Sequence, residues 1–323
     1  MLTGSLPDGE TIISVFSMRI AILCNDRIAL PAIEQLFSAG LIAGVGVPSR
    51  AKEMMFLVKQ RCDAYRVPLR SFEKKDLESS LIDWLQTINP DLVLVKTFPY
   101  LIPARCIPIP PKGFINFHYA PLPEWRGSNP IFWMIRNGES KGGITVHQMN
   151  EAFDEGPVLL EHPMAISPDV NFGMYYTQLA FAGVQATMDL LVGFHNGTLS
   201  PKKQNNSTAK WYDRPSGADL FINWSVMNAI QIKALVNACN PWLKGAATRW
   251  KGWMFGLTDV SVDKEKHNGR IPGTILSIDE TNGFTIACKD DQIIHADVVY
   301  CEEGYYAGHR LCRFGLKKED LLE

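Results

Sequence analysis

The sequence predicts an α/β protein in which a doubly wound sheet is followed by a small, separate β-barrel domain. Two patterns carry this prediction. In the first part of the chain, short apolar runs alternate with helix-like segments, which is typical of a sheet covered by helices on both faces. After about residue 217, short segments of alternating apolar residues are separated by turn residues, which indicates a small barrel. A polar, irregular stretch at residues 200–217 lies between the two patterns and predicts a linker.

The predicted sheet begins at the apolar run RIAILC, residues 19–24, which has the length of a buried strand. Asn25 and Asp26 follow it as helix-capping side chains, and Gly40 ends the helix that they begin. Strands and helices alternate onward in the same way. The further predicted strands are 41–47, 67–71, 91–95, 143–149 and 157–166, and the predicted helices are 29–39, 51–65, 75–88, 128–137 and 171–195.

The chain is predicted to divide at three boundaries. Residues 1–17 contain Asp8 and Glu10 and lack the basic start of a signal peptide, so they form a loose leader or precede an alternative start at Met18. Residues 18–205 form the first domain. Residues 206–323 comprise the linker, one helix at 226–238 and the barrel.

Composition narrows the function. Lys and Arg number 32 and Asp and Glu 34, which gives no support to bulk binding of a polyanion, although a local basic patch fits this balance. The seven cysteines include no CxxC pair, which favours reduced thiols and a cytoplasmic location over a disulfide framework. No apolar run approaches the ~20 residues that span a bilayer.

The segment GFINFHYAPLPEWRGSNP, residues 113–130, carries the strongest chemical pattern. Asn116 and His118 stand at alternate positions of an apolar run, so both side chains leave the same face of a strand. A loop rich in Pro and Gly follows, and Asp154 stands in a second glycine-containing segment, FDEG. An amide, an imidazole and a carboxylate together predict a general-base site with a donor for an oxyanion.

Asn116, His118 and Asp154 also fit other kinds of site. His118 could be an ordinary buried histidine, but its shared strand face with Asn116 weakens that interpretation. A metal site at His118, His147 and Asp154 matches no known ligand spacing, so no metal is predicted. The chain has no GxSxG motif and no cysteine in these segments, which argues against a covalent nucleophile. A GxGxxG motif and a P-loop are also absent, so a dinucleotide is not expected.

The combination of NFHYAPLPEWRGSNP and GGITVHQMNEAFDEGPVL resembles the folate-dependent formyltransferases of the methionyl-tRNA formyltransferase type. That family shares an Asn-x-His motif, a Leu-Pro-x-x-Arg-Gly loop, a Gly-Val-Thr-x-His strand and an Asp-x-Gly loop in this order. The segments WYDRPSGADLFINWS, CNPWLKGAAT and PGTILSID extend the resemblance to about residues 18–310. It implies a Rossmann-like catalytic domain and an OB-like C-terminal barrel.

The resemblance implies an enzyme that moves a formyl group from 10-formyltetrahydrofolate to an amine. It assigns Asn116 as the oxyanion donor, His118 as the general base and Asp154 as the residue that orients this base. In the family the pterin lies against the segment that precedes the motif, which makes Phe98, Tyr100 and Leu101 candidate cofactor contacts. The loop from Tyr119 to Arg126 departs from the family pattern, so Tyr119, Pro121 and Arg126 are expected to contact the acceptor.

The sequence favours a small amine as acceptor, such as an amino sugar nucleotide or a siderophore precursor. Family members that act on tRNA carry a long basic loop after the second strand, whereas VPSRAKEMM offers only Arg50 and Lys52. Three alternatives stay open: a methionyl-tRNA formyltransferase, a 10-formyltetrahydrofolate hydrolase, and an inactive protein that binds RNA or a protein partner.

Overall fold

The computed structural model describes residues 18–281 and 283–323, so the predicted leader at residues 1–17 lies outside the described residues. The chain forms two compact units, and each is assembled from separate stretches of sequence. The first unit contains the residues up to Gly127, Gly142–Met164 and Thr177–Trp211, and the second contains Ser128–Lys141, Ala165–Tyr176 and Tyr212–Glu323.

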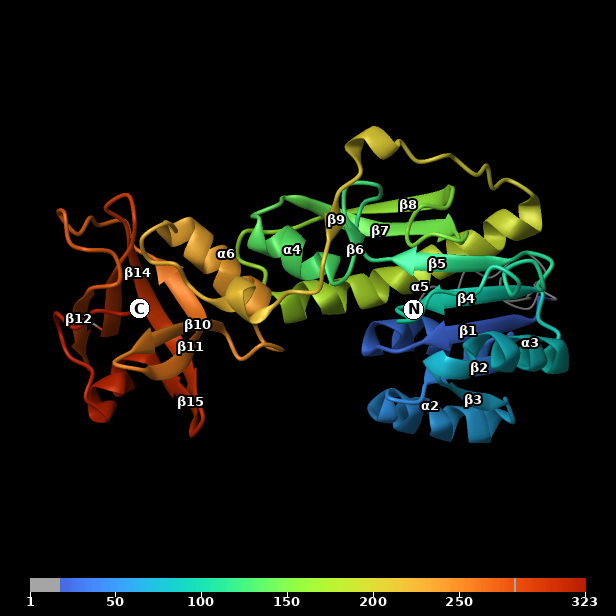
Figure 1. Ribbon diagram of the computed structural model, residues 1–323, viewed down its shortest axis with the longest axis horizontal. Helices are drawn as coiled ribbons and strands as arrows, with labels where there is room; N and C mark the ends of the chain where they lie inside the picture. Colours follow the sequence, from blue (N-terminus) through green and yellow to red (C-terminus); the bar gives the residue numbers. More distant parts are fainter. Residues whose placement is uncertain (1–17, 282) are drawn as a thin grey trace, which may run out of the picture. The chain divides into compact units, whose positions relative to one another are not determined.

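The first unit is built on a seven-stranded sheet with the order β3-β2-β1-β4-β5-β7-β8 (Figure 1). The first five strands along the chain pair in parallel, as buried apolar runs predict. β7 instead pairs antiparallel to β5, so the sheet is mixed. The strands are β1 (Ile20–Cys24), β2 (Ile42–Pro48), β3 (Leu69–Phe72), β4 (Leu92–Lys96), β5 (Phe114–His118), β7 (Lys141–Gln148) and β8 (Val158–Ala165).

Helices lie on both faces of this sheet. Alternate residues of β4 show the two faces: Val95 belongs to the apolar cluster that packs on α3, whereas Lys96 contacts Thr187 of α5. The predicted α/β class is therefore confirmed, and the observed helix ends lie within three residues of the predicted ones. The helical segments are η2 (Arg27–Ala29), α1 (Leu30–Ser38), α2 (Lys52–Tyr65), η3 (Lys74–Asp76), α3 (Leu77–Ile88) and α5 (Phe172–Asn196).

The second unit is built on an antiparallel sheet, as the alternating pattern after residue 217 predicts. The strands follow the order β10-β11-β14-β13-β12, and β15 pairs with β14. α4 (Pro130–Arg136) and α6 (Ala229–Cys239) pack against each other in this unit. The strands are β10 (Ala246–Trp250), β11 (Trp253–Val262), β12 (Ile275–Asp279), β13 (Gly283–Ala287), β14 (Ile293–Cys301) and β15 (Gly304–Ala307).

Short elements complete the chain. β6 (Arg126–Gly127) and β9 (Trp211–Tyr212) form a two-stranded sheet. The 3-10 helices η4 (Asn206–Thr208), η5 (Gly217–Leu220) and η6 (Gly308–Phe314) follow α5 in the sequence. Within residues 18–281 and 283–323, no helix combines the length and the apolar character that a bilayer crossing requires.

All seven cysteines are free thiols. Six of them are buried, and Cys312 in η6 is exposed. Burial raises the pKa of the Cys62 thiol to about 11 and that of Cys239 to about 12.

Candidate active site

Strand pairing places four polar side chains on one face of the sheet. β5 presents Asn116 and His118 on the face that also carries Phe114, which packs toward α3. In the antiparallel register with β7, Asn116 lies opposite His147 and His118 lies opposite Thr145. Directly paired residues share a face, so the edge between β5 and β7 gathers the amide, both imidazoles and a hydroxyl.

His147 holds the amide of Asn116. Nδ1 of His147 lies 2.9 Å from the backbone oxygen of Gln148, which can only accept, so Nδ1 carries the hydrogen. Nε2 is then an acceptor, and Nδ2 of Asn116 donates to it over 3.0 Å. An amide nitrogen has two hydrogens. His147 therefore fixes the amide plane and leaves the second N–H as a donor for another oxygen.

His118 is buried and is held as a neutral base. Its Nε2 lies 2.6 Å from the backbone oxygen of Trp125, so Nε2 donates and Nδ1 keeps a lone pair. Nδ1 lies 3.6 Å from Oδ1 of Asp154. Burial lowers the pKa of His118 below its ordinary value, and the charge of Asp154 opposes this shift only in part. The imidazole is therefore neutral near pH 7 and can take up a proton beside a carboxylate.

Asp154 is held in its ionised form. Its backbone adopts a left-handed conformation with φ of 53°, and its Oδ2 accepts the Gly127 N–H over 3.0 Å. Burial raises the pKa of Asp154, but the neighbouring imidazoles of His118 and His147 and the Gly127 N–H outweigh burial. Together they hold this pKa at about 2. Oδ1 lies 3.6 Å from His118 and 3.8 Å from Nε2 of His147, so one carboxylate faces both imidazoles.

A buried polar network supports the loop that carries Asp154. Arg126 is only 2% exposed. Its guanidinium donates to Oε1 of Gln204 and to Oδ1 of Asn206, each over 2.8 Å, and pairs with Glu155 at 3.3 Å. Nε2 of Gln204 in turn donates to the backbone oxygens of Asp154 and Gly156, each over 2.8 Å. The stretch at residues 200–217, predicted to be a linker, thus supplies Gln204, which holds the loop of Asp154 in place.

Gly156 allows this loop to approach β7 closely. A Cβ atom at this position would lie 1.7 Å from the backbone oxygen of Gln148. No larger residue fits without moving the strand that carries His147. The close approach of the two segments therefore requires a glycine at position 156 of the FDEG segment, in addition to any role in a turn.

The loop after β5 is held by Thr145 of β7. Its hydroxyl accepts the Leu122 N–H over 3.1 Å and donates to the Ala120 oxygen over 2.8 Å. Pro121 lies half-buried between these two bonds. Tyr119 is 4% exposed and lies beside Gly183 of α5, on the opposite face of the sheet from His118. The expected acceptor contacts of Tyr119, Pro121 and Arg126 stay predictions, and Arg126 has protein partners that explain its burial.

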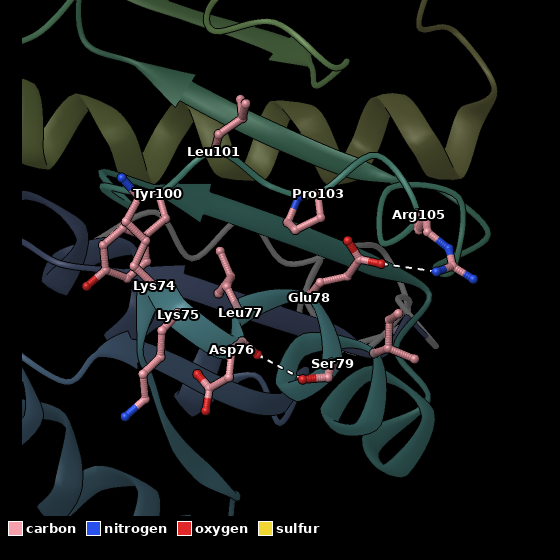
Figure 2. Close-up of a pocket in the computed structure, with 11 residues that line it drawn as sticks. Lys74, Lys75, Asp76, Leu77, Glu78, Ser79, Tyr100, Leu101, Pro103 and Arg105 are labelled. Carbon is pink, nitrogen blue, oxygen red and sulfur yellow. Dashed lines mark hydrogen bonds and ion pairs between the residues drawn. The ribbon is translucent and has the colours of Figure 1, made fainter.

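The candidate folate residues follow β4. Phe98 is 9% exposed and its ring meets Phe72 and Tyr100 edge to face. Tyr100 and Leu101 line a cavity of about 530 Å³, shown in Figure 2. Contacts of these three residues with a pterin remain a prediction. Among the described residues, no group of His, Cys, Asp and Glu side chains has an arrangement that could hold a metal ion.

Sequence reasoning identified three of the residues that meet at this site and missed the support around them. Asn116, His118 and Asp154 come together as their spacing suggested. His147 was considered only as a metal ligand, although its position on the same strand face as Thr145 was visible. Gln204 gave no signal, because a lone glutamine in a polar stretch is typical of exposed chain.

Comparison with known proteins agrees with this geometry. The family model for formyl transferase matches residues 35–191, and that for the formyl transferase C-terminal domain matches residues 216–302. A methionyl-tRNA formyltransferase of Clostridium beijerinckii is 28% identical over 308 residues, covering 91% of this chain and 98% of the relative. The corresponding protein of Geobacter metallireducens is 30% identical over 267 residues, covering 80% of this chain and 84% of the relative.

Solved structures share the fold. An N-formyltransferase of Helicobacter canadensis, in complex with folinic acid and dTDP-3-aminofucose, has a TM-score of 0.65 at 15% identity, covering 90% of this chain and 100% of that one. HypX of Aquifex aeolicus in complex with tetrahydrofolic acid has a TM-score of 0.64 at 18% identity, covering 94% of this chain and 49% of that one. Family models cover both parts of the sequence, and Asn116, His118 and Asp154 lie inside the first of the two matches. The chain therefore belongs to the formyl transferase family.

Proposed function

We propose that this protein transfers the formyl group of 10-formyltetrahydrofolate to a primary amine. The observation that carries the proposal is the joint arrangement of Asn116, His118 and Asp154, with His147 holding the amide. Transfer from an amide-like formyl group needs a base for the amine proton and a donor for the carbonyl oxygen. The site supplies both within one strand face.

His118 accepts the proton that the attacking amine loses. Its Nδ1 holds the free lone pair, because Nε2 already donates to Trp125. A positioned base of this kind contributes ~10²–10⁴ in rate. The proton arrives 3.6 Å from the ionised Asp154, whose charge stabilises the imidazolium.

Asn116 donates its second amide N–H to the formyl oxygen, which gains negative charge during attack. The donor is fixed before the reaction because His147 holds its plane. Fixed donors of this kind are worth ~10²–10³ in rate.

The acceptor best supported is the α-amino group of methionyl-tRNA, rather than the small amine that the sequence favoured. The chain is similar along nearly its whole length to proteins named methionyl-tRNA formyltransferase, including the C-terminal domain. In the second unit, cationic groups lie over aromatic rings, a combination suited to RNA phosphates and bases. These pairs are Lys244 with Tyr300, Arg249 with Phe221 and Lys251 with Trp250, at 4.9, 4.9 and 4.6 Å from the ring centroid.

A small amine is the second candidate, because one observation favours it. β2 ends at Pro48 and α2 begins at Lys52, so three residues join them and only Arg50 among these is basic. This connection has no room for a long basic loop of the kind that the family resemblance implies for tRNA-acting members.

The test measures tetrahydrofolate released from 10-formyltetrahydrofolate by the purified protein. Methionyl-tRNA, an amino sugar nucleotide and a hydroxyornithine are supplied in separate reactions. We expect turnover that requires an amine and is fastest with methionyl-tRNA. His118→Ala should lower kcat by about 10²-fold or more, whereas His162→Gln, on β8 outside the site, should leave kcat unchanged.

The outcomes separate the open alternatives. Release of formate without an amine, at a rate that matches transfer, would identify a hydrolase. Binding of RNA or of a protein partner with no turnover against any amine would identify an inactive binding protein. Full activity in His118→Ala would remove His118 from its role as base.

A further inference from the structure

An exposed tryptophan stands beside the strand that holds the carboxylate of the site. β6 and β9 form a two-stranded sheet, and backbone hydrogen bonds of 3.0 and 2.8 Å join the residues on either side of Gly127 to those on either side of Trp211. The Gly127 N–H donates to Asp154, whose other carboxylate oxygen lies 3.6 Å from His118. One strand pairing and one hydrogen bond therefore connect Trp211 to the carboxylate that faces the base.

A buried cation supports the indole of Trp211 from one side. The Arg126 guanidinium lies over this ring, 6.0 Å from its centroid, yet Trp211 remains 52% exposed. Arg126 is itself 2% exposed and is held in place by Gln204, Asn206 and Glu155. The indole therefore rests on a fixed group and keeps an accessible flat face.

The charges around the indole fit a nucleotide. Glu155 pairs with Arg126 at 3.3 Å, so the cation beneath the ring is neutralised and the flat face suits an uncharged ring. Lys210 directly precedes Trp211, is exposed and forms no ion pair among the described residues, so it can meet a phosphate. An aromatic ring with a cation beside it is the combination that binds a base and the phosphate attached to its sugar.

The candidate acceptors differ in how far a flat ring lies from the reacting amine. In methionyl-tRNA the methionyl group is esterified to the ribose of the terminal adenosine, so the adenine lies only a few bonds from the amine. In an amino sugar nucleotide the base lies beyond a hexose and a diphosphate, and a hydroxyornithine has no ring. A stacking surface beside the site therefore suits an aminoacyl-adenosine best.

Phe153 offers a second exposed ring near the same carboxylate. It directly precedes Asp154 and is 47% exposed. Among the described residues, no cationic side chain lies over the Phe153 ring, so it lacks the fixed support that Arg126 gives to Trp211. Trp211 is therefore the better stacking surface, and Phe153 is the alternative that the experiment must separate from it.

We infer that the terminal adenine of the acceptor stacks on the exposed face of Trp211 while the α-amine reaches His118. Lys210 attracts the phosphate on the 5′ side of that adenosine. This inference rests on the proposed function, because it names the part of methionyl-tRNA that binds beside the same site. It makes Trp211 a specificity residue that selects an aminoacyl-adenosine over an amine without a nucleobase.

The test compares two small acceptors that share the α-amine of methionine. One is methionine joined through an amide to 3′-amino-3′-deoxyadenosine, which resists hydrolysis, and the other is methioninamide. Formylation of each by 10-formyltetrahydrofolate gives a value of kcat/KM. Because stacking of one base is worth a factor of about 10 to 100, the unchanged full chain should prefer the adenosine-bearing acceptor by about this factor.

Two substitutions of Trp211 separate stacking from mere coverage of Arg126. Trp211→Leu keeps an apolar group there without a flat face, so the preference should fall to about threefold or less, whereas Trp211→Phe should keep most of it. The same variants are assayed with methionyl-tRNA, whose KM should rise about 10-fold in Trp211→Leu and much less in Trp211→Phe. The KM for 10-formyltetrahydrofolate should change less than the KM for methionyl-tRNA.

The matched control is Phe56→Ala, which removes a 69% exposed ring of the same unit on α2 and should keep the full preference. No preference in the unchanged protein, an undiminished preference in Trp211→Leu, or equal losses in Trp211→Leu and Trp211→Phe would overturn the inference. Loss of the preference in Phe153→Ala alone would assign stacking to Phe153 instead. A rise in the KM for the folate alone in Trp211→Leu would mean that the ring holds the co-substrate. Absence of transfer to any amine by the unchanged protein would instead refute the proposed function.

Discussion

His147 holds the amide of Asn116 through a 3.0 Å hydrogen bond, so it controls a donor that it does not itself supply. Replacing His147 with Ala frees the amide to rotate away from the formyl oxygen. We expect kcat to fall about 10- to 100-fold, since a misplaced donor retains part of its effect. The KM values for both substrates should change little.

The conservative variant separates positioning from general damage. The Oε1 atom of glutamine in His147→Gln can accept from Asn116, so this variant should recover part of kcat. Circular dichroism and thermal unfolding of both variants check that the fold is intact. Equal loss of kcat in His147→Ala and His147→Gln would contradict a positioning role.

His118 is expected to titrate below its ordinary pKa of about 6.5, because burial disfavours the imidazolium. A base acts in its neutral form, so activity is present above this pKa and is lost as pH falls through it. Asp154 opposes the shift, and Asp154→Asn should therefore move the pKa of His118 further down while lowering kcat. NMR titration of the histidine ring, assigned by comparison with His118→Ala, measures both values. An upward shift in Asp154→Asn would show that the carboxylate acts in another way.

At the scale of elements, the stretch around Gln204 changes how the site is understood. Gln204 is 8% exposed and joins Arg126 to the loop of Asp154. Gln204→Leu would leave two backbone oxygens and part of the Arg126 guanidinium without partners. We expect a loss of about 2–4 kcal/mol in the free energy of unfolding, together with a lower kcat, measured by urea denaturation and by formyl transfer.

The neighbouring position provides the control for this prediction. Lys203 is exposed, and among the described residues its side chain forms no hydrogen bond or ion pair with the loop of Asp154. Lys203→Leu should change the free energy of unfolding by less than about 0.5 kcal/mol. Similar losses in the two variants would mean that the segment tolerates no substitution, whatever its contacts.

The sequence predicted elements better than it predicted their partners. Apolar runs such as residues 91–95 identify β4 because a buried parallel strand needs little else. The direction of β7 was not predictable from its residues, since alternation is the same in both orientations. It runs antiparallel to β5, and α4, which lies between them in sequence, belongs to the second unit instead of crossing the sheet. The sequence does not predict the burial of Gln204, because composition does not distinguish polar residues that face solvent from polar residues that are held by hydrogen bonds inside the protein.

At the scale of the whole molecule, the C-terminal unit is expected to decide how the acceptor binds. Lys244→Gln/Lys251→Gln removes two of the cations that lie over aromatic rings. If methionyl-tRNA is the acceptor, its KM should rise several-fold, and the salt dependence of kcat/KM should lose about one unit of slope for each phosphate contact removed. The KM for the folate should stay the same.

Lys264→Gln/Lys266→Gln provides the comparison, because it removes two exposed cations of the same unit that lie over no aromatic ring among the described residues. If both double variants raise the KM for methionyl-tRNA equally, the cations over aromatic rings contribute only through their charge. No effect of either on tRNA, with normal turnover of a small amine, would favour the second candidate acceptor.

The packing of α4 shows a feature that the sequence pattern does not predict, namely which helix buries its apolar face. Periodicity correctly indicated that α4 has an apolar face, and Ile131, Phe132 and Met134 are buried. It could not indicate that this face packs on α6, almost a hundred residues away. Residues 128–141 and 165–176 likewise belong to the second unit, together with the C-terminal part of the chain. A sequence pattern shows that a residue is buried, but it does not show which distant segment buries it.

The distribution of thiols makes the protein a reporter of its own unfolding. Cys24, Cys62 and Cys106 are buried in the first unit, and Cys239, Cys288 and Cys301 are buried in the second. An alkylating reagent should modify Cys312 at once and each buried group only when its unit opens. In a Cys312→Ser background, mass spectrometry of the modified peptides would therefore time the opening of each half separately, without an added dye or tag. Equal rates for all six thiols would show that the two halves open as one.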